Sequence, residues 1–323
     1  MNPLSSTHTM VEGFECFQIN TGVLELSIIP ELGGKVNSLR DSRTGREWLW
    51  RHPRYPYKRV PHGSVYVDQA DTGGWDECFP SVAQCEYPSD PWQGAAIQDH
   101  GELWSQPAEF DLSQQAGIVK LTTHSQGVVL PYTFTRVITL TENSASVHVD
   151  YEVGSNSDQS IDYVWSMHPL IAIEPGMELL LPASATFNVN GTVPENLVTT
   201  VKNLKYPFAA SGLNFPTLPE TSAARAIKFW SDPLPAGEGW TSVRAQDGEL
   251  KMKWDTALLP QVAVWLNLGA LGMDGGTPYY NMGLEPCMGG QDSLNDAVTK
   301  YNLYETLPPH GAKTWWLEIE LTS

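Results

Sequence analysis

Hydrophobic and polar residues alternate with a period of two along much of the chain, which is typical of antiparallel strands with one buried face. The clearest case is segment 145–153, where Ala, Val, Val, Tyr and Val alternate with Ser, His, Asp and Glu. Segments 134–140, 262–268 and 315–321 behave similarly. Each of the four segments is therefore predicted to form a half-buried strand.

An all-β fold follows from this pattern and from the scarcity of helical periodicity. Segment 24–28 reads as a further strand that ends at Pro30 and turns through a glycine pair, and 27 glycines and 24 prolines punctuate such runs. Only segment 293–300 resembles a helix, a short one capped by Ser293. All-β sandwiches can exceed the usual domain length. We predict one domain over residues 1–323, a large antiparallel β-sandwich.

Composition limits the partners. The chain has 37 acidic and 19 basic residues and a net charge of −18, which argues against nucleic acid and against anionic membranes as partners. No apolar run approaches the roughly 20 residues of a membrane span, and the first residues lack the pattern of a signal peptide. We expect a cytoplasmic protein. Its oligomeric state is not indicated.

The four cysteines predict neither a disulfide framework nor a metal site. No Cys-x-x-Cys pair is present, so the spacing matches no zinc pattern. Cys78 and Cys85 would be able to pair in an oxidising compartment, but free thiols fit a cytoplasmic protein better.

Two further stretches have more than one interpretation. Eight of the nineteen basic residues lie between positions 35 and 59. They form either a solvated surface or, through one or two arginines, a site for an anionic group of a substrate. Segment 206–224, rich in Pro, Ser, Thr and Ala, is predicted to be a long surface loop, and long loops often carry function.

Candidate chemistry is concentrated in four segments that combine titratable residues with Gly, Pro or Trp. They are 71–80, 99–104, the segment around His168-Pro169 and the segment around Glu285-Pro286. A proline after each of the last two residues suggests that the side chains are held at the ends of strands. An imidazole and a carboxylate that face each other suffice for acid/base catalysis without a cofactor, because burial raises the pKa of a carboxyl group and histidine titrates near neutrality.

The order of these segments resembles that of the aldose 1-epimerases, also called galactose mutarotase-like proteins. The resemblance covers most of the chain and rests on short motifs. They are Pro30-Glu31-Leu32-Gly33-Gly34, Arg46-Glu47-Trp48-Leu49, His100-Gly101, His168-Pro169 and Leu284-Glu285-Pro286. The resemblance implies a twisted β-supersandwich whose concave face binds a pyranose.

The resemblance also implies roles for individual residues. Glu285 matches the base that takes the proton of the anomeric hydroxyl, and His168 matches the acid that protonates the ring oxygen. His100 matches a second histidine that hydrogen-bonds the sugar. The ring opens, the C1–C2 bond rotates, and reclosure gives the other anomer. The expected partner is a monosaccharide, a hexose or modified hexose, and no cofactor or metal is needed.

The chain departs from the family pattern at the sugar-binding shell. No arginine lies between Arg59 and His100, where the family has one. The space holds Trp75, Asp76 and Glu77, which we take with His100 as candidate substrate-binding residues. An aspartate that the family places between the second histidine and the glutamate matches either Asp232 or Asp255, so the sugar, neutral or anionic, is left open.

Two other functions compete with a mutarotase. A carbohydrate-binding or regulatory protein on the same scaffold would bind sugar without chemistry. A glycoside hydrolase or lyase would need two carboxylates about 5–10 Å apart, for which Glu285 with Asp76 or Glu77 are the candidates.

Overall fold

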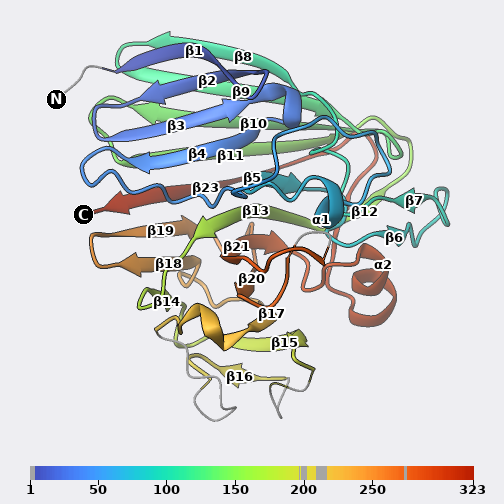
Figure 1. The fold of residues 1–323 in the computed structure, drawn as a ribbon. Coiled ribbons are helices and arrows are strands. Elements are labelled where there is room, and N and C mark those ends of the chain that lie inside the picture. The colour runs from blue at the N-terminus through green and yellow to red at the C-terminus, as the bar shows by residue number, and fades with distance from the viewer. Residues whose placement is uncertain (1–3, 196, 198–201, 209–216, 273–274) are drawn as a thin grey trace.

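Two large antiparallel sheets packed face to face make up most of the molecule (Figure 1). The computed structural model describes residues 4–195, 197, 202–208, 217–272 and 275–323. The all-β supersandwich predicted from the sequence is confirmed.

The larger sheet has eleven strands in the order β1-β2-β3-β4-β5-β13-β21-β20-β17-β15-β16. Their bounds, in that order, are Ser5–Val11, Phe14–Asn20, Leu24–Ile29, Lys35–Asp41, Gly74–Cys78, Trp165–Ala172, Tyr280–Met288, Gln261–Leu268, Arg225–Ser231, Thr186–Val193 and Leu204–Lys205. Strands β5, β13, β21, β20 and β17 follow one another through the middle of Figure 1. Segments far apart in the sequence therefore meet at the centre of this sheet.

The smaller sheet has eight strands in the order β14-β18-β19-β23-β11-β10-β9-β8. Their bounds, in that order, are Glu178–Leu180, Trp240–Ala245, Gly248–Trp254, Ala312–Thr322, Ser146–Ser155, Tyr132–Thr141, Ile118–Gln126 and Glu109–Gln115. In the view of Figure 1, strands β8 to β11 lie behind β1 to β4.

Short elements complete the fold. Two small two-stranded sheets pair β6 (Cys85–Glu86) with β7 (Ala96–Ile97) and β12 (Ile161–Tyr163) with β22 (Glu305–Leu307). The helical elements are α1 (Tyr66–Gln69), α2 (Leu294–Asp296), the 3₁₀ turns η1 (Pro30–Leu32) and η3 (Thr221–Ala223), and the π-helical turn η5 (Ala297–Tyr301). Ser293 accepts a hydrogen bond from the backbone of Asp296 at 3.3 Å, so the predicted cap of the helix at 293–300 is confirmed.

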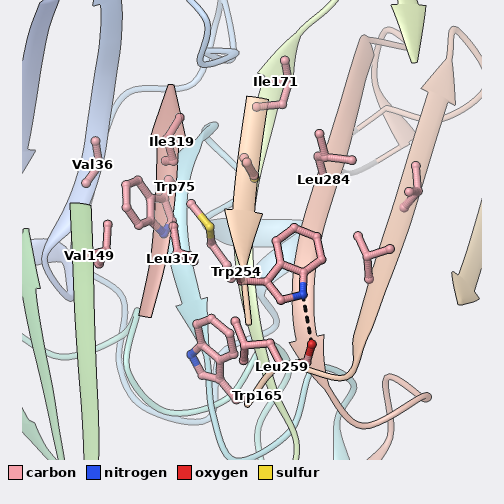
Figure 2. Close-up of a cluster of buried hydrophobic side chains, with 14 of the residues drawn as sticks. Val36, Trp75, Val149, Trp165, Ile171, Trp254, Leu259, Leu284, Leu317 and Ile319 are labelled. Atoms are coloured by element: carbon pink, nitrogen blue, oxygen red, sulfur yellow. Dashed lines mark hydrogen bonds between the residues drawn. The ribbon is translucent and has the colours of Figure 1, made fainter. Parts of the chain in front are cut away.

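The hydrophobic core fills the space between the two sheets (Figure 2). Trp75 and Leu284 from the larger sheet pack in the same cluster as Val149, Leu317 and Ile319 from the smaller one. Aromatic side chains of this size bury large apolar areas. The core thus covers the face of the larger sheet that is turned toward the smaller sheet. The opposite face of the larger sheet is left for other contacts.

The strand pattern read from the sequence is confirmed, with one difference in burial. In β11 the side chains of Val147, Val149 and Tyr151 are buried, and the residues between them are exposed or half-buried. In β20, by contrast, nearly every residue is buried on both faces. β20 lies between β21 and β17 near the centre of the larger sheet, and Trp265 is its one half-buried residue.

The expectation that His168 and Glu285 stand at strand ends is wrong. β13 continues through Pro169 and β21 continues through Pro286, although a proline cannot donate to the ladder of a central strand. The register pairs Ser166 with Cys287 and Leu170 with Gly283. Between these pairs the two strands stay in register, which places His168 level with Glu285.

The cysteines and the long loop can be compared with the predictions. All four cysteines are free, as predicted, and three of them are buried.

The loop predicted at 206–224 falls partly outside the described residues, at 209–216. In its described part, Phe208 and Leu218 are buried rather than exposed. Within the part of the chain that the structure describes, no helix is long and apolar enough to cross a bilayer.

Candidate active site

Charged side chains from neighbouring strands project from the face of the larger sheet that lies opposite the core. His168 on β13 pairs with Asp76 on β5 and lies level with Glu285 on β21. Lys228 on β17 pairs with Trp265 on β20, on the same face of β20 as the partner of Glu285. Because paired residues in a sheet point to the same face, strand register alone gathers these groups from four distant segments.

His168, Glu285 and Lys228 line a cavity of about 430 Å³, a volume typical of small-molecule sites. Loops at the edge of the sheet add further groups. The charged and imidazole side chains of its wall are Asp68, Asp71, Asp99, His100, His168, Lys228, Glu285 and Asp292. The structure therefore brings His100, His168 and Glu285 into one cavity.

Glu285 has one occupied and one free carboxylate oxygen. The side chain is 1% exposed, and Lys228 Nζ donates to its Oε2 at 2.5 Å. Oε1 has no hydrogen-bond partner. A Cβ on Gly283 would lie 2.5 Å from Oε1, so the glycine leaves room for this oxygen. A buried, unpartnered acceptor is costly, and a hydroxyl donor entering the cavity would satisfy it.

Burial raises the pKa of Glu285, and Lys228 limits the rise. Lys228 itself has a raised pKa: burial lowers it, but Asp292, 3.6 Å from Nζ, and Glu285 raise it by more. The ammonium group therefore stays charged. A carboxylate with a raised pKa and one free oxygen has the properties of a general base.

His100 and His168 form an edge-to-face pair with ring centroids 4.9 Å apart. Tyr66 of α1 contacts both rings, stacked on His100 at 4.3 Å and edge-on to His168 at 5.6 Å. His100 has a left-handed backbone with φ 60°, and the next residue is Gly101, where a Cβ would collide with the backbone of Phe79. The loop is thus held against the sheet in a backbone conformation uncommon for residues other than glycine.

The surroundings of the two imidazoles shift their pKa values in opposite directions. Nδ1 of His100 lies 3.0 Å from Oδ1 of Asp99. Burial lowers the pKa of His100, but the hydrogen bond to Asp99 and its charge raise it by more, and the net shift is upward. Burial, and then the positive charges of His100 and Lys228, lower the pKa of His168 well below its ordinary value. His168 has an unpartnered Nδ1. The surroundings thus favour the cation on His100 and the neutral ring on His168.

Asp71 presents a second unpartnered carboxylate oxygen in the wall of the cavity. Its side chain is buried, Tyr279 donates to Oδ2 at 2.7 Å, and Oδ1 has no partner. Burial raises the pKa of Asp71, and the hydrogen bond from Tyr279 opposes the shift.

Trp75 and Glu77, two candidate substrate-binding residues, do not line the cavity. Oε1 of Glu77 accepts from Trp75 Nε1 at 2.9 Å, from Tyr151 at 3.0 Å and from Arg136 at 3.1 Å, and Trp165 donates to Oε2 at 3.1 Å. These groups lie on the core side of β5. Alternate residues of a strand point to opposite faces, so Trp75 and Glu77 are turned away from the site, and their assignment to substrate binding is corrected.

Asp76 points to the same side of the sheet as His168, and two donors hold its Oδ2. Lys35 forms a buried ion pair with it, and Tyr66 donates to Oδ2 at 2.7 Å. Asp76 borders a smaller cavity of about 110 Å³, and Tyr66 lines both this cavity and the larger one. Asp76 therefore holds the hydroxyl of Tyr66 in place and does not itself line the larger cavity.

Neither aspartate considered from the sequence lines the cavity. Oδ1 of Asp232 accepts from Asn188 at 2.8 Å, and Asp255 accepts from the backbone of Ala257 in a turn. Asp71, Asp99 and Asp292 line the cavity instead.

Lys228 is a further residue of the cavity, and the sequence carries a signal for it that the predicted site lacks. Lys228 is the one charged residue within the otherwise apolar run from Ala226 to Trp230. A charge in such a run needs a partner or a function.

The basic segment 35–59 supplies no residue to the larger cavity. Most of its cations are paired elsewhere: Lys35 with Asp76, Arg40 with Glu25, Arg43 with Asp41, Arg46 with Glu174 and Asp247, Arg51 with Glu12 and Arg59 with Glu31. Lys35, Lys58 and Arg59 border the smaller cavity.

Among the described residues, no group of three or more His, Cys, Asp or Glu side chains is arranged to hold a metal ion.

Comparisons with known proteins find likeness in structure only. No family model matches the chain, and no curated protein matches it. A candidate aldose 1-epimerase from Klebsiella pneumoniae has a TM-score of 0.73 at 15% identity, over 99% of this chain and 84% of that one. A galactose mutarotase-like protein from Clostridium acetobutylicum has a TM-score of 0.68 at 12% identity, over 99% of both chains. A galactose mutarotase-like protein from Lactobacillus casei has a TM-score of 0.61 at 15% identity, over 98% of this chain and all of that one. At this level of identity the likeness shows the fold, and the chain has the galactose mutarotase-like fold.

Proposed function

We propose that the protein is a mutarotase that interconverts the α and β anomers of a hexose or modified hexose. The observation that carries the proposal is the free, buried Oε1 of Glu285 in a cavity that it shares with two imidazoles. The surroundings raise the pKa of His100 and lower that of His168. Anomer exchange requires one proton to be removed and one to be delivered on nearby oxygens, with no redox change. The groups present match this requirement.

Glu285 is the base in this proposal. Oε1 takes the proton of the anomeric hydroxyl, a C1=O1 double bond forms, and the electron pair of the C1–O5 bond moves to the ring oxygen. The ring oxygen takes a proton from the imidazole pair. Rotation about C1–C2 and the reverse steps give the other anomer. Each positioned proton transfer contributes about 10²–10⁴-fold to the rate.

The imidazole roles follow from the charges. The family resemblance implies His168 as the acid, but its surroundings disfavour the imidazolium. His100 carries the hydrogen bond to Asp99 and the raised pKa. We therefore assign the transferred proton to His100, and we assign to His168, whose surroundings disfavour the cation, a hydrogen bond to the sugar next to it.

The two carboxylate pairs predicted for a hydrolase, Glu285 with Asp76 or with Glu77, lose support from the geometry. Glu77 lies on the core side of the sheet and Asp76 is paired with Lys35. Neither is therefore placed to act with Glu285 across a glycosidic bond.

The test is the equilibration of pure α-anomers, followed by polarimetry or by NMR of the anomeric protons, with and without the protein. We expect acceleration that Glu285→Gln lowers by two orders of magnitude or more. Asp111→Asn, an exposed change on β8, is the matched control and should keep full activity. A Glu285→Gln variant as fast as the wild type would refute the mechanism. Sugar binding without acceleration in the wild type would favour the non-catalytic carbohydrate-binding alternative.

A further inference from the structure

Asp71 is a buried acceptor that the mutarotase mechanism does not use. It is 5% exposed and lines the larger cavity. Tyr279 occupies Oδ2, and Oδ1 has no partner in the protein. Because buried polar atoms are nearly always hydrogen-bonded, the free oxygen calls for a donor from a bound molecule.

The position of Asp71 is fixed by its surroundings. Asp71 directly follows the C-cap of α1, and its backbone N–H donates at 3.0 Å to the carbonyl of Tyr66, the first residue of that helix. The ring of Tyr279 packs on Trp50 with centroids 4.8 Å apart. Two residues after Asp71, Gly73 has φ 85°, and a Cβ there would collide with the carbonyl of Trp50. The carboxylate is thus presented by a rigid support, as a specific contact requires.

The charges around the cavity are unbalanced. Among the residues that the structure describes, its wall contains five carboxylic side chains and one lysine, and Lys228 is already paired with Glu285 and Asp292. The imidazolium of His100 is paired with Asp99. An anionic substituent would meet no unpaired lysine or arginine in the described part of this wall.

The basic segment does not change this balance. Lys58 and Arg59 border the smaller cavity, on the other side of Tyr66. Arg59 is paired there with Glu31.

We propose that Asp71 is a specificity-determining residue, whose free oxygen binds a hydroxyl or ammonium group of the sugar and excludes phosphorylated, sulfonated and uronic sugars. This rests on the proposed function, because it names the substrate class of the same cavity. The order of preference is amino sugar, then neutral sugar, then anionic sugar.

The experiment compares sugars that differ in charge at one position. The first set varies the charge at C6 and consists of glucose, 6-amino-6-deoxyglucose and glucose 6-phosphate. The second set varies the charge at C2 and consists of glucosamine and N-acetylglucosamine. Dissociation constants come from titration calorimetry or ligand-observed NMR at low salt, and anomer exchange is measured on the same samples. We expect the wild type to bind the phosphate at least about tenfold more weakly than glucose, since like charges repel in a site of reduced dielectric. Asp71→Asn should reduce that ratio by about tenfold, with Asp71→Ser as a second variant if the first does not fold.

The outcomes separate this inference from the proposed function. Asp111→Asn makes the same change in net charge outside the cavity and should leave the ratio unchanged. If no sugar is interconverted but the binding order holds and depends on Asp71, the mutarotase proposal fails and the specificity proposal stands. Equal or tighter binding of glucose 6-phosphate, a ratio unaffected by Asp71→Asn, or binding of none of the sugars overturns the specificity proposal.

Discussion

The ammonium group of Lys228 donates to Oε2 of Glu285 at 2.5 Å, and this contact leaves Oε1 as the free acceptor of the pair. Lys228 thereby does two things for a base. It fixes which oxygen faces the cavity, and its charge lowers the pKa of the carboxyl group against the larger, opposite effect of burial. We regard it as a positioning residue that acts through Glu285.

Replacing Lys228 by methionine should move the acidic limb of the pH profile to higher pH. Glu285 must be deprotonated to act, so activity is lost as the pH falls through its pKa. Without the neighbouring cation that pKa rises further. kcat/KM at neutral pH should therefore fall about tenfold or more and recover in alkaline buffer.

Lys228→Arg, which keeps the charge, is the matched control and should restore part of the neutral-pH activity. A uniform loss for Lys228→Met across all pH values, with no shift of the limb, would indicate a structural role only. Asp292 and His100 also face Glu285. Asp292 raises the pKa of Glu285, so Asp292→Asn should shift the same limb to lower pH, whereas His100→Asn removes the proposed acid and should abolish the acceleration.

Asp99→Asn should move the alkaline limb to lower pH. His100 must be protonated in the proposed mechanism, so activity is lost as the pH rises through its pKa. The hydrogen bond to Asp99 and its charge raise that pKa, and the amide would remove most of this effect. The amide oxygen can still accept from the backbone of Tyr66, which Asp99 Oδ2 binds at 2.9 Å, so α1 should keep its place. NMR titration of the His100 ring gives the pKa directly, and an unchanged value would contradict the assignment.

Gly283→Ala tests the free oxygen by steric means. Its Cβ would lie 2.5 Å from Oε1 of Glu285, so the carboxylate must move. We expect kcat to fall by about tenfold or more, because a misplaced catalytic group is costly, with little change in sugar affinity. Gly191→Ala on β15 is the control, since no atom lies within 4 Å of the added Cβ. Equal activity of the two variants would mean that Oε1 is not the reacting oxygen.

The sequence predicts the strands of this protein well because alternation is a local property. It predicts the site less well because register between distant strands decides which side chains meet. Trp75, Asp76 and Glu77 are adjacent in sequence, yet only Asp76 points to the site face. Which face of β5 packs on the core depends on the tertiary structure, and the sequence of β5 alone does not specify it.

The prolines illustrate the same limit. Pro169 and Pro286 argue locally for strand ends, but both strands continue past them. β13 and β21 are held by neighbours on both sides, so the lost hydrogen bonds are tolerated. Lys228 was missed for a related reason: its partner Glu285 is 57 residues away along the chain.

Arg136 and Glu77 should carry stability rather than activity. Their ion pair is buried between the sheets at 3.1 Å, and Glu77 also accepts from Trp75, Tyr151 and Trp165. Breaking a buried pair leaves an uncompensated charge and costs about 3–5 kcal/mol. Arg136→Met should therefore lower the free energy of unfolding by about that amount in chemical denaturation. At a temperature where the variant is still folded, its KM should match the wild type, because neither residue touches the cavity. A raised KM with unchanged stability would instead restore Glu77 to the substrate-binding residues.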